Sequence, residues 1–234
     1  NLLECCANYK VNQFIFSSSC TVYGQPDHFP VDENTPILPA ESPYGNTKQI
    51  AEEIITDFAN VNPGFKATLL RYFNPVGGHS TGLNGELPKG VPNNLVPFIT
   101  QTAIGKREKL TVFGDDYDTR DGSCVRDYIH VMDISHAHTL AIQKMSTLNA
   151  DQSIQIYNLG TGNGVSVLEV IAAFEKVSGE KLNFEIGPRR EGDIAQIFSN
   201  SEKAYGSLGW TIQYGLEEMM LSAWQWEKNL KLED

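Results

Sequence analysis

Residues 14–19 read FIFSSS, residues 42–48 read SPYGNTK and residues 67–73 read ATLLRYF. The first is a short apolar run that ends in small polar residues, and the last is mostly apolar, so both are predicted to be strands of a parallel sheet, the first of them buried. Between them, a helix is predicted from Pro43 to about Asn60. Ser42 is its expected N-cap, Pro43 is its first residue, and apolar residues follow at helical spacing. A strand, a helix and a strand in this order predict a right-handed parallel unit of an α/β fold.

The rest of the chain predicts two α/β domains. Residues 1–75 are expected to be the remaining, C-terminal part of a Rossmann-like parallel sheet, with a helix at 2–7 and a long loop at 25–41. After Asn74 and Pro75 a loop rich in Gly, Pro and Asn reaches Asn94. Beyond it we expect a smaller α/β substrate-binding domain over residues 76–234, from which some segments return to the first domain. Its predicted helices lie at 95–104, 131–145, 166–177 and around Trp224 and Trp226, and its predicted strands at 110–113, 154–159 and 182–186.

Composition narrows the function classes. The chain has 234 residues, of which 41% are hydrophobic, so it can bury one large core or two smaller ones. Its net charge of -11 repels phosphate polymers, so we expect no nucleic-acid partner and no anionic membrane surface. No run approaches the ~20 apolar residues of a membrane helix. The four cysteines contain no C-x-x-C pair, which argues against a disulfide framework or a zinc site and favours a reducing, cytoplasmic setting.

Tyr44 and Lys48 are candidate catalytic residues. They are four residues apart, so they share one face of the predicted helix. A free phenol has a pKa of ~10, and a phenol that takes up protons near neutral pH needs a positive neighbour. The ammonium of Lys48, the positive end of the helix and an oxidised nicotinamide can provide it. The pair predicts a general base, although Tyr and Lys also occur at this spacing by chance, as an exposed pair without function.

Ser19 ends the first apolar run. Ligands bind at the carboxyl ends of strands in open parallel sheets, and a serine hydroxyl both donates and accepts hydrogen bonds. Ser19 is therefore predicted to relay a proton between a sugar hydroxyl and Tyr44. The alternative is a hydroxyl that only caps the following turn.

These residues carry a family resemblance. FSSSCTVYG at 16–24 and SPYGNTK at 42–48 closely resemble the extended short-chain dehydrogenase/reductase superfamily. Within it, the chain is similar to the UDP-glucose 4-epimerases, also called UDP-galactose 4-epimerases. The matching stretches span almost the whole chain: LRYFNP at 70–75, GVPNNL at 90–95, VRDYIHV at 125–131, YNLGTG at 157–162 and RREGD at 189–193.

The resemblance implies NAD-dependent interconversion of UDP-glucose and UDP-galactose in galactose metabolism, by transient oxidation at C4 of the hexose. At matching positions Tyr44 is the base, Lys48 tunes it and holds the nicotinamide ribose, and Ser19 relays the proton. The positions that line NAD are Ser17, Tyr44, Lys48 and Phe73. The positions that hold the UDP-sugar are Ser19, Asn74, Asn94, Leu95, Phe113, Arg126, Val167, Arg190, Asp193 and Ile197.

The chemistry of several of these residues agrees with a diphosphate ligand. Arg126 and Arg190 are planar, permanently charged donors, but either can instead form a surface salt bridge with Asp127 or Glu191. Asn74 and Asn94 suit hydroxyls and phosphate edges, and they also suit plain turns. Phe113 can pack on uracil, while a lone aromatic residue at a strand end is more often part of a core.

Two further patterns are rejected as sites. GTGNG at 160–164 follows a predicted strand, but its spacing and the lack of a ribose-reading acid ~20 residues later do not fit a dinucleotide fingerprint. His136 and His138 are two residues apart on a predicted helix, so they do not face one another. They are interpreted as surface histidines, and no metal site is predicted.

The chain also departs from the resemblance. The glycine-rich fingerprint turn and its acid are absent, so we expect an N-terminally truncated chain that alone binds NAD poorly and turns over little. Ile197 matches a position that gates room beside the 2-substituent of the sugar, and isoleucine leaves open whether N-acetylhexosamines fit.

The resemblance also implies a homodimer, with the helix that carries Tyr44 and Lys48 at its interface. Three alternative functions remain open. The chain can be a nucleotide-sugar decarboxylase, a dehydratase or a catalytically inert UDP-sugar-binding fragment. A dehydratase would need acidic residues just after the strand-end hydroxyl, where this chain has Cys20 and Thr21.

Overall fold

The computed structural model describes residues 1–149 and 152–233. The chain folds into two compact units. Unit 1 comprises Asn1–Phe73, Ile134–Gly162 and Ser199–Thr211, and unit 2 comprises Asn74–Asp133, Asn163–Phe198 and Ile212–Asp234. The chain thus leaves unit 1 after Phe73 and returns to it in two later segments.

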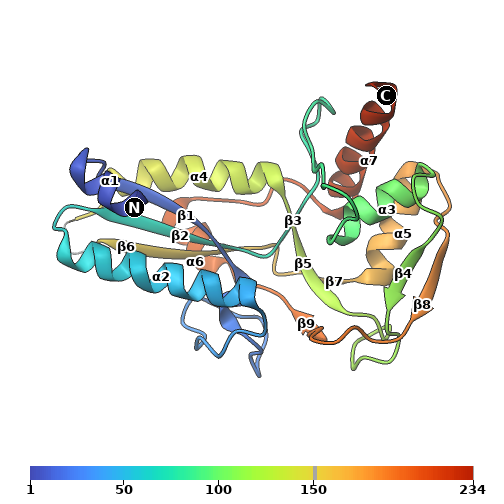
Figure 1. Ribbon diagram of the computed structural model, residues 1–234, viewed down its shortest axis with the longest axis horizontal. Helices are drawn as coiled ribbons and strands as arrows, with labels where there is room; N and C mark the ends of the chain where they lie inside the picture. Colours follow the sequence, from blue (N-terminus) through green and yellow to red (C-terminus); the bar gives the residue numbers. More distant parts are fainter. Residues whose placement is uncertain (150–151, 234) are drawn as a thin grey trace. The chain divides into compact units, whose positions relative to one another are not determined.

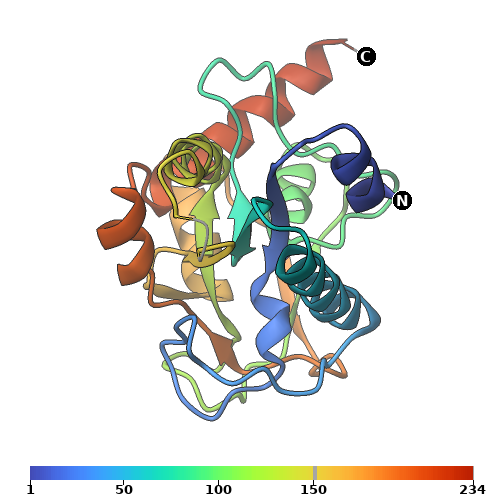
Figure 2. The same cartoon turned by 90° about the vertical axis from the view of Figure 1, so that its left-hand side faces the viewer.

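Unit 1 is built on a parallel three-stranded sheet with the order β1-β2-β6. Helices α2 and α4 cover opposite faces of this sheet (Figures 1 and 2). Helix α6 packs against β6. The elements of this unit are α1 (Leu2–Asn8), β1 (Gln13–Ser19), the 3-10 helix η1 (Cys20–Tyr23), α2 (Pro43–Val61), β2 (Lys66–Tyr72), α4 (Val131–Met145), β6 (Ile154–Leu159) and α6 (Glu202–Leu208).

The start of α2 follows from local chemistry. The Ser42 hydroxyl accepts a hydrogen bond from Gly45 N at 3.1 Å, and Pro43 is the first helical residue. Ile55 faces the sheet and is buried together with Phe65 and Leu69 of the unit 1 core. The opposite side of the helix leaves other apolar residues exposed.

Unit 2 contains two small sheets. In the first, β5 pairs in parallel with β3 and β9 and antiparallel with β7, and in the second β4 pairs in parallel with β8. The elements are β3 (Asn74–Val76), α3 (Leu95–Ala103), β4 (Leu110–Phe113), β5 (Val125–His130), β7 (Gly164–Ser166), α5 (Val167–Ser178), β8 (Phe184–Gly187), β9 (Gln196–Ile197) and α7 (Leu216–Glu233).

The core of unit 2 lies where α5 and α7 meet. Phe174 and Trp224 are both buried, and their rings pack edge to face with centroids 5.6 Å apart. Ser166 caps α5: its hydroxyl accepts from Glu169 N, while Ser166 N donates to the Glu169 carboxylate. This cap fixes the point at which β7 ends and α5 begins.

The α/β class predicted from the sequence is confirmed, with parallel pairing in both units. Three details differ from the predictions. Residues 14–16 of β1 are half-buried, not buried. Strand β3 covers Asn74–Val76, so the loop predicted to follow Pro75 begins one residue later, and β8 begins at Phe184, two residues after the predicted start. Strands β5, β7 and β9 and helix α6 have no counterpart among the predicted elements. None of the helices in the described part of the chain is both long and apolar enough to cross a membrane.

Candidate functional site

Unit 1 brings Ser19, Tyr44 and Lys48 onto one strand-helix unit. Ser19 is the last residue of β1 and is paired in register with Tyr72, the last residue of β2. Tyr44 lies in the first turn of α2 and has 55% of its surface exposed. Because β1 and β2 are parallel, their carboxyl ends form one edge of the sheet, which is where α/β proteins bind ligands.

Lys48 connects the helix to the strand. Its Nζ donates a hydrogen bond to Ser17 O at 2.8 Å, and it lies 5.4 Å from the centre of the Tyr44 ring and 5.0 Å from that of Phe16. At these distances the ammonium is attracted by the faces of both rings. The positive charge is thereby held next to the phenol of Tyr44, the arrangement that a phenolate base needs.

The side chains of Ser17 and Ser19 have different partners. Ser19 Oγ accepts from Thr21 N at 3.3 Å, so Ser19 does cap the turn after β1, as its alternative interpretation expected. This contact uses one lone pair and is compatible with a second role. Ser17 Oγ lies 3.0 Å from Tyr72 Oη, and Tyr72 Oη lies 2.8 Å from His138 Nε2.

His138 corrects one sequence interpretation. It was interpreted as a surface histidine, yet it is half-buried, and its Nδ1 lies 2.9 Å from Ile134 O. Since a carbonyl can only accept, His138 Nδ1 carries a hydrogen and donates it to Ile134 O. His136 is half-buried as well. The surface interpretation failed because it considered only the helix and not the strand that α4 covers.

Sequence reasoning also missed Glu52 and Arg71. Both are buried, and Arg71 Nη2 lies 2.6 Å from Glu52 Oε2. Glu52 follows Tyr44 and Lys48 at the same four-residue spacing along α2, which is the one signal in the sequence that places it on their face. Arg71 has no local signal, because its partner comes from another element.

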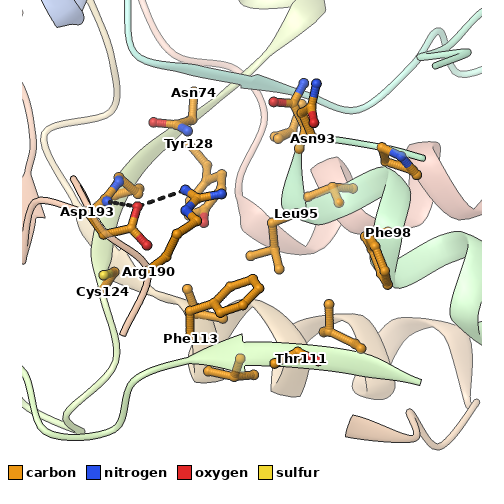
Figure 3. Close-up of a pocket in the computed structure, with 18 of the residues that line it drawn as sticks. Asn74, Asn93, Leu95, Phe98, Thr111, Phe113, Cys124, Tyr128, Arg190 and Asp193 are labelled. Atoms are coloured by element: carbon orange, nitrogen blue, oxygen red, sulfur yellow. Dashed lines mark hydrogen bonds and ion pairs between the residues drawn. The ribbon is translucent and has the colours of Figure 1, made fainter. Parts of the chain in front are cut away.

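Unit 2 contains a cavity of about 500 Å³, a size common for small-molecule sites. Eight of the ten residues expected to hold a UDP-sugar line it: Asn74, Asn94, Leu95, Phe113, Arg126, Val167, Arg190 and Asp193. They come from β3, α3 and its N-cap Asn94, β4, β5, α5 and the loop after β8. Figure 3 shows Arg190 and Asp193 on one side of the cavity and Leu95 and Phe98 on the other.

The charged side of this cavity contains two arginines around one carboxylate. Arg190 Nη2 donates to Asp193 Oδ1 at 2.7 Å, and Arg126 Nη2 lies 3.8 Å from the same oxygen. The hydrogen bond to Asp193 raises the pKa of Arg190 above its usual value, so this guanidinium stays charged. Arg126 also donates to Ile194 O at 2.7 Å. The ion-pair partner of both arginines is therefore Asp193, not Asp127 or Glu191.

The other side of the cavity is apolar. Phe113 is 44% exposed and lines the cavity, so the core interpretation of this residue is wrong. Its ring centre lies 5.7 Å from the Arg190 guanidinium. Asn94 Nδ2 donates to Glu86 Oε1 at 2.6 Å. The two arginines that line the cavity, one of them beside an exposed aromatic ring, suit an anionic ligand with a planar group.

Two expected site residues lie elsewhere. Ser19 belongs to unit 1, and Ile197 is buried in β9, opposite Arg126 in the pairing with β5, without lining the cavity. Phe73, expected to line NAD, is buried, and its N–H donates to Leu159 O at 3.2 Å. The four cysteines are free thiols. Among the described residues no group of three His, Cys, Asp or Glu side chains could hold a metal ion.

Comparisons with known proteins identify the family of the chain. The family model described as GDP-mannose 4,6 dehydratase matches residues 1–222. A UDP-glucose 4-epimerase from Erwinia amylovora is 50% identical over 226 residues, which are 97% of this chain and 66% of that protein. A UDP-glucose-4-epimerase from Stenotrophomonas maltophila, solved with bound NAD and formylated UDP-arabinopyranose, superimposes with a TM-score of 0.95 at 44% identity, covering 100% of this chain and 68% of that one. The chain belongs to the UDP-glucose 4-epimerase family.

A second solved member of the UDP-glucose 4-epimerase family, from Bifidobacterium longum in complex with NAD+ and UDP, has a TM-score of 0.92 at 44% identity. The match covers 97% of this chain and 67% of that one. The chain spans about 65% of the length of the curated epimerases it matches. The resemblance to the extended short-chain dehydrogenase/reductases is thereby confirmed, and the epimerases are favoured over the decarboxylases and dehydratases. Cys20 and Thr21 after Ser19 agree with that choice.

Proposed function

We propose that this chain interconverts UDP-glucose and UDP-galactose by transient oxidation at C4 of the hexose. The observation that carries the proposal is the Lys48 ammonium, which lies 5.4 Å from the Tyr44 ring at the carboxyl edge of a parallel sheet. A base and its positive neighbour at this edge are what proton abstraction from a sugar hydroxyl needs. Membership of the epimerase family supports the choice of substrate.

In the proposed reaction Tyr44 Oη takes the proton of the hexose 4-hydroxyl and later returns it to O4. Ser19 Oγ, the last hydroxyl of β1, relays this proton between O4 and Tyr44. Lys48 stabilises the phenolate while its Nζ stays anchored on Ser17 O. The proton is thus borrowed and returned, and there is no net change in protons over one turnover.

NAD is the proposed cofactor, and when bound it supplies an acceptor that takes the C4 hydride and gives it back. The residues present fit its nicotinamide end. Lys48 offers an ammonium to the ribose. Ser17 lies two residues before the end of β1, and Phe73 directly follows the adjacent parallel strand β2. Support also comes from the family members solved with NAD.

The cavity of unit 2 is proposed to hold the UDP part of the substrate. Arg126 and Arg190 would bind the diphosphate, and Phe113 and Leu95 would pack on uracil. Asn74, Asn94 and Asp193 would form hydrogen bonds with the hydroxyls and phosphates, and Val167 would pack against the ligand. Ile197, which pairs with Arg126 from the neighbouring strand β9, is proposed to limit the room beside the 2-substituent of the sugar.

The native protein is proposed to be a cytoplasmic homodimer. Ile50, Ile54 and Val61 on α2 are 46%, 55% and 76% exposed, which leaves an apolar strip that a second copy would cover. Free cysteines agree with a reducing compartment. Sedimentation of the native protein should show a dimer, and Ile54→Glu should shift it toward the monomer. A wild-type monomer would contradict the proposal.

The activity is tested by incubating the native protein with NAD and UDP-galactose and measuring UDP-glucose. We expect interconversion in wild type and its loss in Tyr44→Phe, with UDP still bound in both. If wild type binds UDP and NAD but never forms UDP-glucose, the proposal fails and the chain is an inert UDP-sugar-binding protein.

A further inference from the structure

We propose that Glu52 and Arg71 form a buried positioning pair. They hold α2 in one register against the carboxyl end of β1, and thereby place Tyr44 and Lys48 for proton transfer. This inference rests on the proposed function, because it concerns the same catalytic site. Neither residue touches the reacting atoms, so both act through the residues that they hold.

The Glu52 carboxylate is fully engaged by groups from two strands. Arg71 of β2 donates to it twice, from Nε to Oε1 at 3.0 Å and from Nη2 to Oε2 at 2.6 Å. Ser18 Oγ of β1 donates to Oε1 at 2.5 Å. The exposed fractions are 8% for Glu52, 3% for Arg71 and 2% for Ser18, so water screens none of these contacts.

Hydrogen bonds extend from Arg71 to residues of η1 and β6. Arg71 Nη1 donates to Tyr23 Oη at 3.0 Å, and Tyr23 Oη donates to Asn158 Oδ1 at 2.6 Å. Asn158 N donates in turn to Glu33 Oε1 at 2.7 Å. Burial raises the pKa of Tyr23 to about 12, so its hydroxyl remains a donor. Burial opposes the charge of Arg71, but the hydrogen bond to Glu52 leaves its pKa raised. One network thus joins β1, β2 and β6 to α2.

The pair acts next to the catalytic residues because of its place in the sequence. Tyr44, Lys48 and Glu52 follow one another at four-residue intervals, so they lie on one face of α2. Lys48 is bound to Ser17 O and Glu52 to Ser18 Oγ. Consecutive residues of β1 are therefore tied to consecutive turns of α2. Sliding or rotating the helix would break both contacts at once.

A buried ion pair is a poor way to gain stability alone, because the desolvation of two charges offsets much of their attraction. A packed apolar pair would serve the core equally well. A bidentate pair does better at excluding other registers, since no shifted arrangement satisfies all of its hydrogen bonds. Proton transfer needs this accuracy, because a displacement of ~1 Å can cost about 10²-fold in rate.

The experiment compares Glu52→Gln with Glu227→Gln in the native protein with NAD. Glu227 is the matched control, a glutamate of unit 2 that is 3% exposed and paired with Lys106 Nζ at 3.0 Å. We expect Glu52→Gln to lower kcat for UDP-galactose by about 10-fold or more while KM and UDP affinity stay within about two-fold. Glu227→Gln should lower the melting temperature and leave kcat unchanged. An unchanged kcat in folded Glu52→Gln overturns the proposal.

Two further variants protect the test against misfolding. Ser18→Ala removes one hydrogen bond of Glu52 and retains the ion pair, so it should fold and show a smaller loss of kcat. The effects of Glu52→Gln and Arg71→Met on kcat are also measured singly and together. The double variant should lose no more activity than the more impaired of these two single variants, because the effects of residues that act as a unit are not additive. Full additivity, or an unchanged kcat in Ser18→Ala, contradicts a positioning pair.

Hydrogen–deuterium exchange separates this proposal from the proposed function. Peptides that cover residues 14–24 and 43–52 should exchange faster in Glu52→Gln than in wild type, and no such change should occur there in Glu227→Gln. If wild type has no epimerase activity, the proposed function fails, and exchange alone decides whether the pair holds α2. Unchanged exchange in both segments would overturn the positioning role.

Discussion

Tyr44 and Lys48 lie one turn apart on α2, and the Lys48 ammonium is 5.4 Å from the centre of the Tyr44 ring. The same ammonium is bound to Ser17 O, so its place is set by the strand and not by the helix alone. A tyrosine and a lysine at this spacing are common by chance. The contact with β1 is what fixes this pair at the carboxyl edge of the sheet, where α/β proteins bind ligands.

Replacing the Tyr44 hydroxyl should abolish most of the activity. Tyr44→Phe keeps the ring beside Lys48 but removes the atom that takes the proton, so kcat should fall by about 10²- to 10⁴-fold. The melting temperature should hardly change, because the side chain is 55% exposed. Tyr9→Phe is the control, since Tyr9 is an 81% exposed tyrosine of the same unit. Equal activities of the two variants in the UDP-galactose assay would contradict the role of Tyr44.

Arg190 should bind the diphosphate, whereas its neighbour Arg189 should not. Arg190 lines the cavity of unit 2, and Arg189 donates instead to Asp116 at 2.6 Å on the surface. Arg190→Met should weaken UDP binding by about 10-fold or more, because charge-assisted hydrogen bonds to phosphate are lost. Calorimetry with UDP measures this directly. Arg189→Met removes the same charge and should leave the affinity near wild type. A similar loss in both variants would mean that only net charge matters.

The elements predicted correctly from the sequence are those with a strong local pattern. Helix α2 has a cap, a first-turn proline and apolar residues at helical spacing, and β2 contains the short, mainly apolar stretch Ala67–Leu70. Strand β5 has neither signal, because its sequence VRDYIH contains three ionisable residues besides Tyr128. The structure buries Asp127 and His130 of this strand almost completely, which only tertiary partners make possible.

The residues of the candidate site likewise fall into those that the sequence predicted and those that only the structure revealed. Residues in contiguous motifs, such as Asn94 and Leu95 or Arg190 and Asp193, were identified because the motif is visible in the sequence. The pair of Glu52 and Arg71 was not, since 19 residues separate them and they meet only when α2 packs on β2. Motifs identify the groups that touch a ligand, whereas the groups that hold them in place emerge from the fold.

Gly122 should tolerate no side chain. Its φ is +81°, and a Cβ atom would lie 1.9 Å from Asp115 O, in the loop that leads to Cys124 of the cavity. Gly90 has a similar φ of +77° but nothing within 4 Å of its Cβ position. Gly90→Ala should therefore cost only the left-handed conformation, about 1–2 kcal/mol. Gly122→Ala adds a clash with backbone and should cost clearly more in urea unfolding. Equal costs would contradict the tight loop.

His130 should make the stability of the native protein depend on pH. It is 2% exposed; Met132 N donates to its Nδ1 at 3.0 Å, so the hydrogen is on Nε2, which donates to Ser222 Oγ at 3.0 Å. Protonating Nδ1 would break the first of these bonds. Burial lowers the pKa of His130 to about 4, whereas an unfolded histidine has a pKa of ~6.5.

Below pH ~6.5 the unfolded chain therefore takes up a proton that the folded protein refuses until about pH 4. The contribution of His130 to the free energy of unfolding is complete above pH ~6.5 and is lost as the pH falls toward 4. The free energy of unfolding should therefore fall by about 2 kcal/mol between pH 7 and pH 5 because of this histidine. Urea unfolding at both pH values measures it. His130→Asn should be less stable at pH 7 yet lose about 2 kcal/mol less than wild type on acidification. His28→Asn, at an exposed histidine, should keep the wild-type dependence, and an unaltered slope in His130→Asn would assign the pH effect to other groups.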